Sequence, residues 1–197
     1  MSHDVYATPE APLLVGEKLP DHDLYVVSKS KFTVLFISTL GLYGVYWFYK
    51  NFRQQKDRHN LNIWPVPRGI FSIFFAHSLF RTIDEKLKSG GIEYSWNSGS
   101  MATLFVGASI VNNISSNLAN KSIGSPYMDI LGFVLTFVIY YCLYTAQKAI
   151  NLSQGDAEGL INSRYTLANY IWILVGILIW GLAAIGILMT TGVIEGY

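Results

Sequence analysis

Three long apolar runs without a charged residue constrain this chain more than any other feature. They extend over residues Phe32 to Tyr49, Ile130 to Ala146 and Tyr170 to Met189, which are 18, 17 and 20 residues long. A helix rises about 1.5 Å per residue, so about 20 apolar residues cross the roughly 30 Å hydrocarbon core of a bilayer. A soluble chain of 197 residues has little interior in which to bury three such helices on all sides. The sequence therefore predicts an all-helical membrane protein.

The overall composition agrees with a lipid environment. Charged residues make up 14% of the chain, whereas about a quarter of the residues in a soluble domain are charged. The net charge of +1 provides no strong field to attract nucleic acid, so we expect the lipid bilayer, and no nucleic acid, as a partner. The single cysteine, Cys142, excludes a disulfide within one chain.

Two further segments are ambiguous as membrane spans. Residues 101–118 are uncharged, but their second half is rich in Asn and Ser. A helix that begins near Gly69 and continues to about Lys88 is amphipathic, which is typical of an interfacial or re-entrant helix. Its apolar side contains Ala76, Leu79, Phe80, Ile83 and Leu87, and its polar face contains His77, Arg81, Asp84 and Glu85.

The distribution of Lys and Arg favours four spans over five. These residues concentrate on the cytoplasmic side of short loops. With four spans and an outside N-terminal tail, 10 of the 14 lie inside. A fifth span over the amphipathic helix leaves 6 inside and 8 outside, and reversing that orientation gives only 8 inside and 6 outside. We therefore predict four transmembrane helices and one amphipathic or re-entrant helix, with five spans as the alternative. Residues 1–31 are predicted to be a polar, poorly ordered N-terminal tail, and residues 32–194 the helical membrane domain.

The end of the first apolar run has the composition of a helix that leaves the bilayer. Aromatic rings favour the headgroup level, and basic side chains favour anionic lipid headgroups. The predicted interfacial anchor consists of Tyr43, Tyr46, Trp47, Tyr49, Lys50, Arg53, Lys56 and Arg58. Within the run, Ser38, Gly41 and Gly44 form a strip of small residues that permits close approach of another helix.

The same residues resemble a known family. Residues 41–51 have the pattern Gly-Leu-Tyr-Gly-x-Tyr-Trp-x-Tyr-Lys-Asn, which is similar to the first span of a family of small bacterial inner-membrane proteins of unknown function. A Pro-Arg connector before a Phe-rich helix (Pro67, Arg68, Phe71) and the Gln-Lys-Ala-Ile-Asn stretch at 147–151 are also similar. The resemblance implies a multi-pass protein of the bacterial inner (cytoplasmic) membrane. It implies no activity.

A polar stripe follows one side of the uncharged segment that begins at residue 101. The stripe consists of Ser109, Asn112, Asn113, Ser116 and Asn120. On a helix that turns about 100° per residue, these side chains fall within about 60° of one direction. The apolar run that begins at Ile130 offers a counterpart on one side, which consists of Thr136, Tyr140, Tyr144 and Gln147. Asn in lipid is costly unless it is paired, so the stripe is expected to face protein or water. Three interpretations follow: hydrogen bonds between helices, a hydrated cavity, or a half-segment outside the membrane.

No motif for catalysis, a cofactor or a metal occurs in the sequence. We therefore predict a non-catalytic integral membrane protein without catalytic residues, cofactor or metal. It acts by helix–helix or lipid contacts in an accessory role, with a second copy or another membrane protein as partner. The first alternative is a small transporter or channel whose polar cavity is lined by Asn112, Asn113, Ser116, Tyr140 and Tyr144. Further alternatives are an immunity protein that blocks a membrane-acting toxin, and a lipid-acting enzyme with His77 as base.

Overall fold

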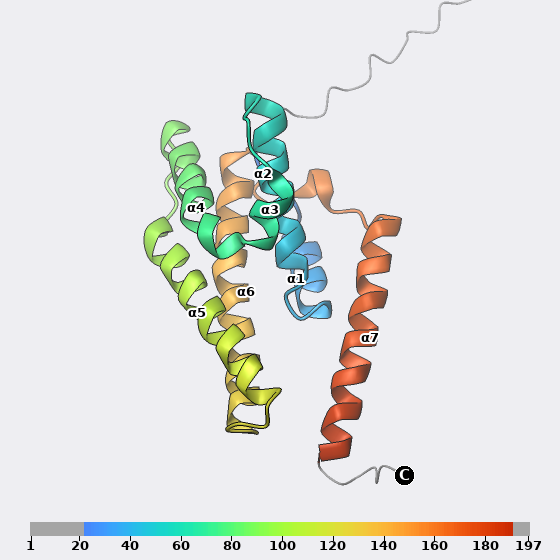
Figure 1. Ribbon diagram of the computed structural model, residues 1–197. Helices are drawn as coiled ribbons and strands as arrows, with labels where there is room; N and C mark the ends of the chain where they lie inside the picture. Colours follow the sequence, from blue (N-terminus) through green and yellow to red (C-terminus); the bar gives the residue numbers. More distant parts are fainter. Residues whose placement is uncertain (1–21, 191–197) are drawn as a thin grey trace, which may run out of the picture.

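The computed structural model describes residues 22–190, and every regular element within that range is a helix (Figure 1). The elements are α1 (Lys29–Ser38), α2 (Tyr43–His59), α3 (Pro65–Ile70), α4 (Ser72–Ser89), α5 (Ser98–Ala119), α6 (Tyr127–Ser153), the 3-10 helix η1 (Leu160–Asn162) and α7 (Leu167–Thr190). The predicted all-α class is confirmed. In Figure 1, α2 and α4 end at one end of the molecule, while α5, α6 and α7 extend to the other.

The first apolar run folds back on itself as a helical hairpin. Leu40 and Gly41 have positive φ values of 47° and 91° and separate α1 from α2. The ring centroid of Phe32 lies 5.9 Å from that of Tyr43 and 6.3 Å from that of Trp47. A straight helix would separate residues 32 and 47 by about 22 Å along its axis. The prediction that this run is one crossing helix is therefore wrong.

α6 is the one helix in residues 22–190 that is long and apolar enough to cross a membrane by length and composition. It has 27 residues, and only 17% of its most apolar window is buried inside the protein. Its neighbour α5 packs along it, and the two are joined by the short connection at residues 120–126. The apolar part of α7, Leu167–Leu182, is shorter. These observations agree with association with a membrane.

The amphipathic pattern of α4 is confirmed, but the surroundings of its apolar side differ from the prediction. All five predicted apolar residues are buried, and α4 packs against α5 and α6. The helix begins at Ser72, after a break at Phe71 that separates it from α3, and not at Gly69. Its apolar face therefore belongs to the protein core and is not available to lipid.

The last residues of the predicted N-terminal tail are part of the packed domain. Leu24 and Val27 are completely buried in an extended segment before α1, and Lys31 within α1 is also buried. The predicted boundary between residues 31 and 32 is therefore too late by at least eight residues. The part of the predicted tail at 1–21 lies outside the described residues.

Candidate functional site

A buried network of side-chain amides joins α2, α6 and the extended segment before α1. Its centre is Gln147 of α6, whose Oε1 accepts a hydrogen bond from Nε1 of Trp47. Nε2 of Gln147 donates to the carbonyl oxygen of Tyr25 at 3.1 Å and to Oδ1 of Asn151 at 2.7 Å. Gln147 was predicted to face the polar stripe of α5. The structure places it in this network instead, completely buried.

Two asparagines complete the network by bonding the backbone of the extended segment. Asn51 accepts from the backbone N of Tyr25 at 3.0 Å and donates to the carbonyl of Trp47 at 3.0 Å. Asn151 donates to the carbonyl of Val27 at 2.9 Å and accepts from the Val27 N–H at 3.4 Å. An extended segment without a neighbouring strand needs such partners because buried backbone groups must be paired. The sequence analysis did not identify these structural roles for Asn51 and Asn151.

Part of the predicted interfacial anchor lies in the protein core. Tyr43 and Trp47 are completely buried, because the hairpin places this side of α2 against α1 and α6. The prediction that these two rings lie at the headgroups is wrong. The other members are partly or fully exposed: Tyr46, Tyr49, Lys50, Arg53, Lys56 and Arg58. Among them, Nε of Arg53 pairs with Asp57 at 2.7 Å on the surface of α2.

A groove of about 300 Å³ lies between the tip of the α1–α2 hairpin and the middle of α5 and α6. Its polar lining comes from Ser72, Ser109, Asn112, Asn113 and Thr136. Ser109 and Thr136 donate to the carbonyls of residues four positions earlier in their own helices. The side chain of Asn112 makes no hydrogen bond within residues 22–190. The groove therefore presents an unpaired amide beside apolar side chains from α1, α2, α5 and α6.

Helices α5 and α6 approach each other closely beside this groove. A Cβ on Gly132 of α6 would lie 3.3 Å from Oδ1 of Asn112 and 3.8 Å from Oγ of Ser116. Asn112 and Ser116 of the stripe thus face α6. Asn120, in contrast, is exposed and follows the last residue of α5.

The other half of the predicted cavity faces a different helix. The hydroxyl of Tyr140 lies 2.8 Å from Oγ1 of Thr33 on α1, and its ring is stacked on Tyr144 with centroids 5.4 Å apart. Both rings also pack against Phe32. Neither tyrosine lines the groove that contains Asn112. The predicted single cavity is therefore divided between two faces of α6.

The polar face of α4 contains no histidine–carboxylate pair in the described part of the chain. Nε2 of His77 lies 3.1 Å from Oγ1 of Thr103 on α5. Asp84 accepts from Nε1 of Trp96 at 3.2 Å and pairs with Lys88 at 2.7 Å. Arg81 and Glu85 are exposed.

Comparisons with known proteins identify no family for this chain. No protein-family model matches the chain, and no curated protein or solved structure is significantly similar to it. The interpretation of the site therefore depends on its own geometry.

Proposed function

We propose that this chain is a non-catalytic, multi-pass protein of the bacterial inner membrane that binds a transmembrane helix of another protein in the groove between the hairpin, α5 and α6. The observation that carries the proposal is the unpaired amide of Asn112 in that groove. An amide at membrane depth is costly without a partner, and lipid tails offer none. A polar side chain on a partner helix would supply one. The bacterial source rests on the family resemblance alone.

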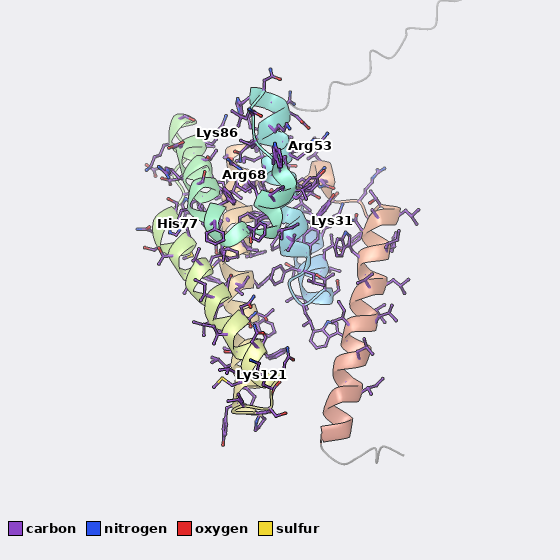
Figure 2. All side chains as sticks on the ribbon, in the orientation of Figure 1. Lys31, Arg53, Arg68, His77, Lys86 and Lys121 are labelled. Carbon is purple, nitrogen blue, oxygen red and sulfur yellow. The ribbon has the colours of Figure 1, made fainter. Side chains whose placement is uncertain are left out.

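The proposed membrane arrangement has three full spans, α5, α6 and α7, and the α1–α2 hairpin as a re-entrant element in place of the fourth predicted span. The distribution of basic residues supports an orientation of this arrangement in the membrane. Lys31, Arg53, Arg68 and Lys86 lie toward the end where α2 and α4 terminate, and Lys121 lies at the opposite end (Figure 2). The positive-inside rule assigns the first end to the cytoplasm. Residue 22 then lies on the cytoplasmic side, in contrast to the outside tail predicted from the sequence.

Cysteine accessibility tests the arrangement. In a Cys142→Ala background, Ser30→Cys and Leu61→Cys place a thiol at the two ends of the hairpin, and Ile123→Cys places one between α5 and α6. A membrane-impermeant maleimide is applied to right-side-out and inverted vesicles. We expect the thiols at 30 and 61 to react only in inverted vesicles and the thiol at 123 only in right-side-out ones. Reaction of 30 and 61 from opposite sides would show that the first run crosses the membrane.

Photo-crosslinking tests the groove. A photoreactive amino acid replaces Leu42, which lines the groove and is half exposed, and a control replaces Val134 of α6, which is equally exposed but lies outside it. We expect a discrete protein adduct from position 42 and lipid adducts alone from position 134. Asn112→Leu should weaken the adduct about 3- to 20-fold, because a hydrogen bond between membrane helices contributes about 0.6 to 1.7 kcal/mol. The control Asn120→Leu alters an exposed Asn that follows the last residue of α5 and lies outside the groove. Lipid adducts alone from position 42 contradict the proposal.

A further inference from the structure

A second cavity, of about 210 Å³, lies between α1, α2 and the first turn of α7. Two lysines, Lys31 and Lys50, line it together with the amides of Asn162 and Asn169. No acidic side chain is among its lining residues in the described part of the chain. The cavity is therefore cationic without an internal counter-charge.

Lys31 is the more unusual of the two lysines because it is buried without an anionic partner. Its exposed fraction is 1%, and Nζ lies 2.7 Å from both Oδ1 of Asn162 and the carbonyl oxygen of Arg164. Both acceptors are neutral, and the described residues place no carboxylate within 4.0 Å of this nitrogen. Burial lowers the pKa of Lys31. A buried ammonium is costly unless it is paired, so an anion in the cavity would stabilise this site.

Two further features of the cavity favour an anion. Nζ of Lys50 lies 5.5 Å from the ring centroid of Tyr25, and no ion pair fixes it elsewhere in residues 22–190. The cavity also meets residues 168 and 169 in the first turn of α7. The N-terminus of a 24-residue helix carries a partial positive charge and N–H groups without helical partners. The positive groups thus converge from three helices.

We propose that this cavity binds a phosphate group, supplied by the headgroup of an anionic phospholipid. Tyr46 and Trp172 line the same cavity with ring centroids 6.3 Å apart, and such amphipathic rings favour the headgroup level of a bilayer. Ile171 beside Trp172 and Leu174 on α7 are more than half exposed and offer an apolar surface to an acyl chain. The phosphate site stands on the lysines and the cavity, and only its lipid source rests on the proposed membrane placement.

The test measures ligand-dependent thermal stability of the full chain in a neutral detergent. The probes are dioctanoyl phosphatidylglycerol, dioctanoyl phosphatidylcholine and inorganic phosphate. Lys50→Gln removes one charged contact, and Lys148→Gln is the matched control because Lys148 lies over the ring of Tyr144 outside the cavity. A ligand that binds the folded state raises its melting temperature with concentration.

We expect phosphatidylglycerol to stabilise the wild type at concentrations where phosphatidylcholine does not. Lys50→Gln should raise the phosphatidylglycerol concentration required for half the effect about tenfold or more, as expected for a hydrogen bond to a charged group. Lys148→Gln should leave it unchanged.

The outcomes separate the site from its source. Equal stabilisation of the wild type and Lys50→Gln by phosphatidylglycerol, or equal effects of the two lipids, overturns the phosphate site. Stabilisation by inorganic phosphate at the same concentration as phosphatidylglycerol supports the site and overturns the lipid source. Failure of the groove crosslink leaves all of these results unaffected, so the two proposals fail independently.

Discussion

Replacing Gln147 by Leu should destabilise the protein far more than the same replacement at another buried glutamine. Gln147→Leu removes the acceptor for Nε1 of Trp47 and the donor for the carbonyl of Tyr25. Each buried polar group left without a partner costs about 1 to 3 kcal/mol. Two such groups give an expected loss of about 2 to 6 kcal/mol, while the similar volume of Leu keeps the packing term small.

The matched control is Gln55 of α2, which is also buried. Its Nε2 has no hydrogen-bond partner, so Gln55→Leu removes an unsatisfied polar atom instead of creating one. We expect a change in the free energy of unfolding within about 1 kcal/mol, in the stabilising direction, because the Nε2 group of Gln55 is buried without a partner. The assay is unfolding by SDS titration in mixed micelles, followed by tryptophan fluorescence. Equal losses in the two variants, or a loss below about 1 kcal/mol at Gln147, would refute the reasoning from unpaired groups.

Two further variants test local contacts. A Cβ at Gly176 would lie 2.3 Å from the carbonyl oxygen of Ser38, whereas a Cβ at Gly181 would meet nothing within 4 Å. Gly176→Ala should therefore weaken the contact of α7 with α1, and Gly181→Ala should leave it intact. Hydrogen exchange of the α7 backbone measures this difference. At Asp156, burial opposes ionisation, but N–H groups of the following turn donate to the carboxylate and lower its pKa overall. Its contribution to stability is therefore present above the unfolded pKa and lost as the pH falls through the folded value. Asp156→Asn should make the free energy of unfolding less dependent on pH in the acidic range, and an unchanged dependence would contradict this assignment.

Local periodicity predicted α4 well because its apolar face is defined within one helix. All five residues at helical spacing are buried, whichever neighbours cover them. Hydropathy does not predict the hairpin, because it reports the absence of charge and contains no information on where the chain reverses its direction. The available signal was the Gly-Leu-Tyr-Gly stretch after Leu40, since glycine tolerates the positive φ that a reversal requires. A run of uncharged residues therefore limits the environment of a chain but not its path.

The candidate site was predicted in halves for a related reason. Asn112 and Ser116 both lie toward α6, because their relative direction on α5 follows from helical geometry. Which side of α6 they meet depends on where α1 packs, and α1 occupies the side that carries Tyr140. Gln147 is separated from its partner Tyr25 by 122 positions, so no local pattern connects them. Side-chain amides within an apolar run were the signal that something polar must face them.

Two of the three stretches that carry the family resemblance, 41–51 and 147–151, meet in the structure, and this contact separates their role from that of the binding surfaces. Trp47 and Asn51 belong to the first stretch, and Gln147 and Asn151 to the second. All four are completely buried and bond one another or the extended segment before α1. Buried residues of this kind hold a ligand surface in place without touching the ligand. Their substitution should therefore reduce stability, lipid response and crosslinking together. Asn112→Leu should act on crosslinking alone, and Lys50→Gln on the lipid response alone.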